Sequence, residues 1–166
     1  MSVPRAKKKK QRTNVPKPPE QRRIMQANMM CVAVAIEHLY EDYGWRTMRI
    51  NRLVNTFWDE LCEAKRLQNE EYVKRVPQHI ATQAEKATGA VIISECKGMD
   101  KYRADCYMLC VGCLVLALRK LKVNKLRCQI IAKDIFYHLE TYEPWSVYKA
   151  VYEMTGYDVR TNIRWD

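Results

Sequence analysis

Apolar residues recur at helical spacing along most of this chain, and this periodicity limits the possible folds more than any other feature. The first stripe advances in steps of four and three residues: Met25, Met29, Val32, Ile36, Leu39 and Tyr43. Such steps place side chains on one face of an α-helix. Similar stripes predict helices over residues 47–67, 77–87, 100–121, 125–141 and 144–154. We therefore predict an all-α fold, a compact bundle of five to seven helices.

Residues that form turns are scarce, which also favours helices. The chain has 5 Gly and 6 Pro, and four of those prolines fall within the first 19 residues. Three segments have a weaker pattern. We predict a short third helix over residues 69–76, a strand or an extended linker over 90–98, and an extended tail from residue 157.

The two halves of the chain share one order of features. Each half has an uncharged helix, a basic turn, an amphipathic helix, a helix that starts with proline, and a Thr-Gly stop. The basic turns are GWRTMRINR at 44–52 and KVNKLR at 122–127. This order is typical of a degenerate tandem repeat, residues 21–92 and 100–160, but two unrelated short helical bundles would also show it.

Positive charge is concentrated before the first helix. Residues 1–23 hold nine of the 29 Lys and Arg residues and one of the 19 acids, whereas residues 24–166 hold 20 and 18. Residues 1–20 also lack apolar periodicity, so we expect a disordered basic arm followed by a helical domain, 21–166. A polycationic arm suits contact with phosphates; a nuclear-import signal or a solubilising tail would have the same composition.

The cysteines indicate a reducing compartment. There are seven: Cys31, Cys62, Cys96, Cys106, Cys110, Cys113 and Cys128. The number is odd and no secretory signal precedes them, so we expect free thiols, mostly buried, in a cytoplasmic protein. The uncharged runs 24–36 and 106–118 have 13 residues each. A membrane-spanning helix needs roughly 20, so we expect no membrane partner.

Two patterns have residue types that occur in metal or acid–base sites. Cys106, Cys110 and Cys113 share one helix face, but a single helix cannot surround a zinc ion, so we interpret them as buried thiols. The pairs His38–Asp42 and Asp134–His138 stand at i,i+4 spacing. Each pair suits a metal ligand or an acid–base pair, but we favour surface hydrogen bonding. We expect no metal, no cofactor and no enzymatic activity.

The candidate nucleic-acid-binding residues are all basic. Those of the arm are Arg5, Lys7, Lys8, Lys9, Lys10, Arg12, Lys17, Arg22 and Arg23. Those of the two turns are Arg46, Arg49, Arg52, Arg119, Lys120, Lys122, Lys125 and Arg127. If the halves pack with two-fold pseudo-symmetry, both turns lie on one surface and contact two phosphate tracks, aided by helix N-termini. Alternatively, these are solvated turn residues that pair with Glu37, Glu41 or Asp42.

The region around the first turn suggests two further hypotheses. A helix, a short turn with glycine and the helix 47–67 together have the order of a helix-turn-helix unit, which would expose Asn51 or Asn55 to base edges. Trp45 and Trp165 lie beside arginines. They either stack on bases or pack at helix ends.

One segment resembles a known group of proteins. Residues 35–61 read AIEHLYEDYGWRTMRINRLVNTFWDEL. This segment resembles a pattern in small uncharacterised helical prophage-encoded proteins, where an acidic-aromatic-Gly turn is followed by basic residues. The match rests on Leu39, Asp42, Gly44, Trp45, Arg46, Arg49 and Leu53. The resemblance implies a phage or mobile-element origin and transfers no activity and no functional residue.

These features lead to two functional hypotheses. The first is a non-enzymatic accessory or regulatory protein that binds DNA or RNA through the arm and the basic turns. The alternative is a phage-encoded inhibitor that binds a host nucleic-acid-processing or defence protein, such as a CRISPR effector or its guide RNA. A hydrolase would need convergent carboxylates, and the sequence offers no candidate for them.

Overall fold

A computed structural model describes residues 19–162 of the chain, except 71, 72, 74 and 142. Residues 1–18 of the predicted arm lie outside the described residues. Residues 19 and 20 already belong to the first described helix, so helical structure begins before the predicted boundary at residue 21.

The fold is all-α, as predicted. Its helices follow the chain in the order α2 (Pro19–Tyr43), α3 (Thr47–Asn69), α4 (Val76–Thr88), α5 (Lys101–Lys120), α6 (Lys125–Thr141), α7 (Pro144–Thr155) and α8 (Val159–Asn162). A single 3₁₀ turn, η1 (Ser94–Cys96), lies between α4 and α5. No strand occurs among the described residues.

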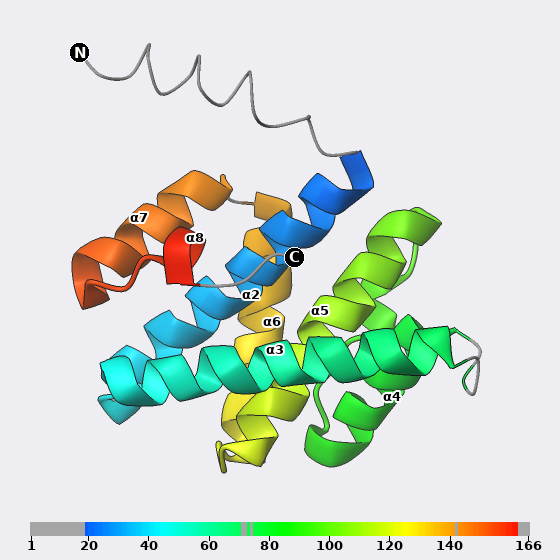
Figure 1. Ribbon diagram of the computed structural model, residues 1–166, viewed down its shortest axis with the longest axis horizontal. Coiled ribbons are helices and arrows are strands. Elements are labelled where there is room, and N and C mark those ends of the chain that lie inside the picture. The colour runs from blue at the N-terminus through cyan, green and yellow to red at the C-terminus, as the bar shows by residue number, and fades with distance from the viewer. Residues whose placement is uncertain (1–18, 71–72, 74, 142, 163–166) are drawn as a thin grey trace.

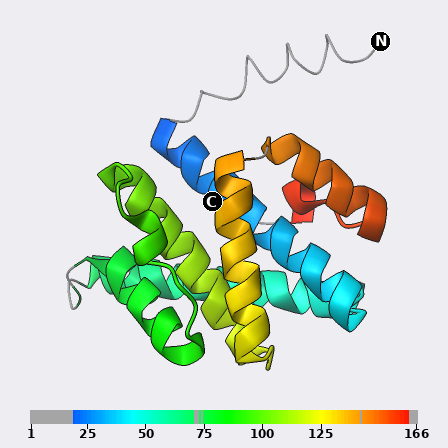
Figure 2. The same cartoon turned by 180° about the vertical axis from the view of Figure 1, so that it is seen from behind.

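Two helices form the centre of the bundle. Every residue of α2 over 27–36 is buried, and so is most of α5 over 106–118. These are the two uncharged runs of the sequence, and burial on all sides explains why they carry no polar face. In Figure 1, α3 crosses this pair on the near side, and Figure 2 shows α6 on the opposite side.

The remaining helices pack across the two halves. Helix α4 packs against α5, and α7 packs against α2. The α4–α5 contact is close, because a Cβ added at Gly112 would lie 2.9 Å from Cγ2 of Ile80 and 3.2 Å from the backbone nitrogen of Ala81. Glycine therefore lets the two helix backbones approach each other.

Corresponding positions in the two halves adopt matching conformations. Both α4 and α7 have a proline in the first turn, and both are followed by a glycine, Gly89 or Gly156, with φ of 78° or 76°. In each case the preceding threonine, Thr88 or Thr155, donates its hydroxyl to the carbonyl four residues earlier, at 2.8 and 2.7 Å. These matches are what a tandem repeat predicts; the duplication itself stays a prediction.

The predicted short helix over residues 69–76 was wrong. Helix α3 continues to Asn69 and α4 begins at Val76, so helices flank the segment on both sides. Arg75 has φ of 59°, the left-handed region, which a right-handed helix cannot contain.

Two other weak segments are now defined. Residues 90–98 form a linker without a strand, and from Ile93 on it is a turn with one 3₁₀ helix rather than extended chain. The backbone N–H groups of Ile92 and Ile93 donate to Oε2 of Glu85 at 2.8 and 2.9 Å, which takes donors that a strand ladder would need. The tail prediction was wrong for α8, a short helix within the segment predicted to be extended.

Candidate nucleic-acid interface

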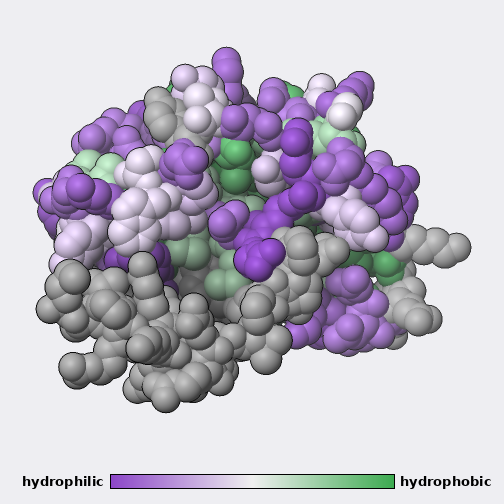
Figure 3. Space-filling model, turned by 90° about the horizontal axis from the view of Figure 1, so that it is seen from above, coloured by the Kyte–Doolittle hydropathy of each residue, from purple (hydrophilic) through white to green (hydrophobic). Residues whose placement is uncertain are grey.

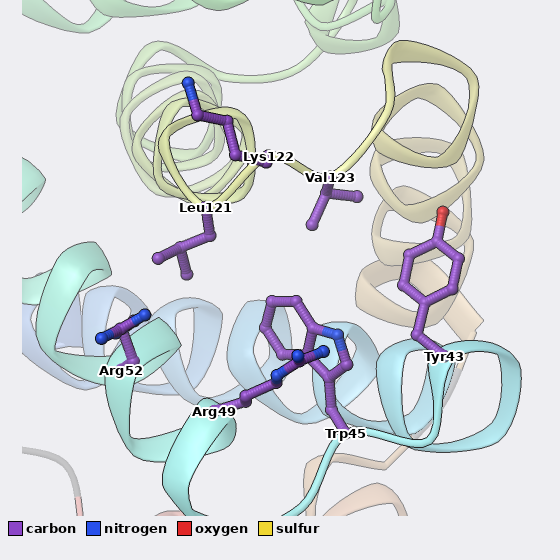
Figure 4. A pocket seen from close by; sticks show the side chains of 7 residues that line it. All are labelled: Tyr43, Trp45, Arg49, Arg52, Leu121, Lys122 and Val123. Carbon is purple, nitrogen blue, oxygen red and sulfur yellow. The ribbon is translucent and has the colours of Figure 1, made fainter.

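The two basic turns meet around one cavity. It has a volume of about 340 Å³ and lies between the start of α3 and the end of α5. Its described lining residues are Tyr43, Trp45, Arg49, Arg52, Leu121, Lys122 and Val123. We call this cavity the basic cleft (Figure 4). Residues about 75 positions apart in the chain therefore share one site.

The first wall of the basic cleft follows from the end of α2. Gly44 takes φ of 65°, which costs glycine little, and the Trp45 N–H donates to the carbonyl of Leu39 at 3.1 Å. Trp45 is 7% exposed, so its indole anchors the turn to the core. The chain then enters α3 at once, which places Arg49 and Arg52 on one side of its first turns.

The second wall is built in the same way at the end of α5. Lys122 takes φ of 67°, close to that of Gly44, although it is not a glycine. The Val123 N–H donates to the carbonyl of Leu118 at 3.1 Å, and the Val123 side chain is buried. Asn124 caps the start of α6, because its Oδ1 accepts the Arg127 N–H at 2.7 Å.

Side chains tie the two turns together. Asn124 donates from Nδ2 to the Tyr43 hydroxyl at 3.1 Å, and Arg127 pairs with Oδ2 of Asp42 at 2.7 Å. The Arg127 guanidinium also lies 5.6 Å from the Tyr43 ring centre. These contacts hold the start of α6 against the end of α2, so the cleft has fixed walls.

The cleft is positively charged. None of Arg49, Arg52 and Lys122 forms an ion pair with any residue that the structure describes, and no acid is among the described lining residues. The Arg49 guanidinium lies over the Trp45 ring, 5.9 Å from its centre, whereas Lys122 extends away from the cavity at its rim (Figure 4). Its cations are therefore not neutralised by described carboxylates.

Four of the five other basic residues of the turns have partners within the protein. Arg46 lies 4.3 Å from the Tyr40 ring centre, and Arg119 donates to the Val123 carbonyl at 3.3 Å. Lys120 forms an ion pair with the buried Glu60. Of these residues, Arg127 therefore follows the alternative of pairing with Glu37, Glu41 or Asp42, whereas Lys120 pairs with a different acid. Lys125 is exposed and has no ion pair among the described residues.

The two arm candidates that the structure describes, Arg22 and Arg23, lie far from the cleft. Those from Arg5 to Lys17 lie outside the described residues. Arg22 is exposed, and Arg23 lies 3.4 Å from Oδ1 of Asp100. Arg23 and Tyr43 stand at opposite ends of α2, which at 1.5 Å per residue separates them by about 30 Å.

The tryptophan and asparagine hypotheses have different outcomes. Trp45 packs at a helix end, as its burial shows, and its ring is not open for stacking. Trp165 lies outside the described residues. Asn51 and Asn55 are exposed on α3, where the helix-turn-helix hypothesis needs them, and that hypothesis stays a prediction.

The two histidine pairs converge, which the sequence did not indicate. Nε2 of His38 lies 2.7 Å from Oδ2 of Asp134, and Nδ1 of His138 lies 3.2 Å from Oδ1 of the same carboxylate. Asp42 lies 3.8 Å from Nδ1 of His38. Nearby, partial burial and then the charge of Glu41 raise the pKa of Glu37. This cluster links α2 to α6 beside the basic cleft.

The sequence predicted the cations of the cleft and singled out Trp45, but it did not indicate the rest of the uncharged lining. Tyr43, Leu121 and Val123 were not candidates, because apolar residues at helix ends usually serve packing alone. Their positions next to a glycine or to Lys122, where two helices turn, were the available signal. The cysteines agree with prediction: all seven are free thiols, and only Cys62 is exposed.

Comparison of the chain with protein-family models, with curated proteins and with solved structures found no match. Within the described part of the chain, no helix is long and apolar enough to span a membrane. Nor does any group of three or more His, Cys, Asp or Glu residues there have a metal-binding arrangement.

Proposed function

We propose that this chain is a non-enzymatic nucleic-acid-binding accessory or regulatory protein of phage or mobile-element origin, and that the basic cleft contacts the phosphate backbone. One observation carries the proposal. Two arginines and a lysine from turns far apart in sequence surround one cavity, and they lack described carboxylate partners. Arginine recognises phosphate oxygens through paired N–H groups, so Arg49 and Arg52 are the leading contacts.

The helix ends add to this charge. The basic cleft lies beside the first turns of α3 and close to the first turn of α6. N–H groups of a first helical turn have no partner within the helix and carry a partial positive charge. In α3 the residue before the helix, Arg46, makes no side-chain cap, so these groups remain available to an anion.

The arm supplies a second source of charge. Nine Lys and Arg residues lie within residues 1–23. Residues 1–18 precede the first described helix. A chain of that length spans up to about 60 Å when extended, which exceeds the length of α2. The arm would add association rate and affinity that depend on salt rather than on sequence.

Fluorescence anisotropy with labelled single-stranded DNA, duplex DNA and RNA tests the proposal. The wild-type chain is compared with Arg49→Gln/Arg52→Gln. Arg66→Gln is the matched control, because Arg66 lies on the same helix but is paired with Glu63 and Glu70. We expect the cleft variant to bind about tenfold more weakly, the loss of roughly 1.4 kcal/mol, and the control to bind like wild type.

Equal affinities for the cleft variant and the control would exclude the cleft as a contact surface. If the wild-type chain bound none of the three nucleic acids at low salt, the proposed function would be wrong. The inhibitor of a host nucleic-acid-processing or defence protein would then be the hypothesis to test, with that protein as the ligand.

A further inference from the structure

A second cavity lies at the other end of α2 from the basic cleft. Its volume is about 460 Å³, and it opens between the start of α2, the start of α4 and the start of α5. Apolar side chains such as Ile24, Val76 and Leu109 form much of its wall, and Arg23 and Lys101 lie among its lining residues. Figure 3, which views the molecule from above, shows apolar atoms in hollows between hydrophilic side chains. A cavity of this size suits a small organic molecule.

Two thiols also line this cavity. Cys106 and Cys110 stand one helical turn apart on α5, and both line the cavity. Cys110 is buried in the core, where it meets α2 at Cys31. The Cys106 sulfur therefore lies near both the Cys110 thiol and the positive charge of Arg23.

The surroundings make Cys106 differ from the other buried thiols. The neighbouring Cys110 thiol lowers the pKa of Cys106 against the effect of burial, and the charge of Arg23 lowers it further. Burial raises the pKa of Cys31 and of Cys113. The thiolate is the nucleophilic form of cysteine, so reactivity is expected where a donor and a cation favour it.

We propose that Cys106 is a covalent modification site and that this cavity binds small apolar electrophiles, namely alkenes conjugated to a carbonyl group. The Cys106 thiolate sulfur forms a bond to the β-carbon of the alkene. The alkene π pair moves toward the carbonyl, whose oxygen carries the enolate charge, and the enolate carbon then takes a proton from water. The addition needs no leaving group and no oxidant. The inference is independent of nucleic-acid binding.

The apolar walls and the cations have separate roles in this reaction. Ile24 and Leu109 offer apolar surface to the body of the electrophile. Arg23 favours the thiolate and also the enolate charge that develops on addition. Exposed Cys62, on α3, is not among the described lining residues of this cavity and serves as an internal reference.

Labelling of the native chain with limiting N-phenylmaleimide, followed by peptide mass spectrometry, tests the proposal. We expect Cys106 to react several-fold faster than Cys62, although Cys62 is more exposed. The Cys106 rate should saturate as the N-phenylmaleimide concentration rises, because binding precedes addition, whereas the Cys62 rate should stay proportional to concentration. Arg23→Gln, a change at an exposed residue, should slow labelling of Cys106 and leave Cys62 unchanged.

Three results would overturn the inference. If Cys62 takes the label first and Cys106 reacts only in urea, Cys106 is an inert core thiol. A Cys106 rate that rises linearly with probe concentration excludes binding in the cavity. An Arg23→Gln chain with the wild-type rate at Cys106 removes the role of the cation.

Discussion

Lys122 adopts a backbone conformation that lysine rarely takes. Its φ of 67° matches the 65° of Gly44 at the corresponding turn of the other half. A left-handed conformation costs a side-chain-bearing residue about 1–2 kcal/mol, and glycine avoids most of that cost. Strain of this kind persists where the surrounding structure over-determines it, often at functional sites. Lys122 lines the basic cleft, the cavity that we propose contacts phosphates.

Replacing Lys122 by glycine should separate stability from binding. We expect Lys122→Gly to raise the free energy of unfolding by about 1 kcal/mol, because strain is relieved, although glycine also gives up entropy on folding. The same change should weaken nucleic-acid binding, because one cation leaves the cleft. Arg75→Gly is the control: its φ of 59° predicts a similar gain without the effect at the cleft. Urea titration measures the free energy of unfolding, and fluorescence anisotropy measures the affinity for nucleic acid. A Lys122→Gly chain that is less stable than wild type would contradict the strain argument.

Glu37 should make stability depend on pH. Its pKa in the folded protein is raised above the ordinary 4.5, chiefly by partial burial and then by Glu41. The contribution of Glu37 to stability is therefore complete below the ordinary pKa of 4.5, and it is lost as pH rises through the raised pKa of the folded protein. Glu37→Gln should match wild type near pH 4 and exceed it above neutral pH by up to about 0.5 kcal/mol, measured by urea denaturation. An equal difference at both pH values would argue against this cause.

At the scale of the helix, periodicity and end signals carried most of the prediction. Helix starts were correct where a side chain caps the backbone: Asp100 accepts the Arg103 N–H at 2.9 Å, and Asn124 caps α6. These signals are local, so they can be read from neighbouring residues. The segment over 69–76 failed because the left-handed conformation of Arg75 leaves no mark in composition.

The arrangement of helices was beyond the sequence. The convergence of the basic turns was predicted only on the condition that the halves pack with pseudo-symmetry, because contacts between distant helices set it. The histidine cluster shows the same limit: His38 and Asp134 are separated by 96 residues, and each belonged to a different local pair. The cations of the cleft could be found because charge is visible residue by residue, whereas its apolar walls could not.

The α4–α5 contact should not tolerate a methyl group. A Cβ at position 112 would lie 2.9 Å from Ile80 and 3.2 Å from the backbone of Ala81, and a backbone cannot move aside as a flexible side chain can. We expect Gly112→Ala to lower the free energy of unfolding by about 1–2 kcal/mol, since overpacking outweighs the helix propensity of alanine. Thermal or urea unfolding measures it. A variant as stable as wild type would show that the two helices are farther apart.

The whole molecule separates its functional features along α2. The basic cleft lies at the C-terminal end of that helix, whereas the Cys106 cavity lies at its N-terminal end, and residues 1–18 precede the helix in the chain. The charge is divided in the same way, because residues 24–166 are nearly balanced while residues 1–23 are strongly basic. A nucleic acid held by both would follow α2 over about 30 Å, which corresponds to about nine base pairs of B-form duplex.

The salt dependence of binding tests this account most directly. For phosphate contacts, the logarithm of the affinity falls linearly with the logarithm of salt concentration, by about 0.9 per contact on duplex DNA. We predict that Arg49→Gln/Arg52→Gln reduces this slope by about 2 relative to wild type, and that Arg66→Gln leaves it unchanged. If the cleft variant and the Arg66 control show the same slope and affinity, the basic cleft does not hold phosphates.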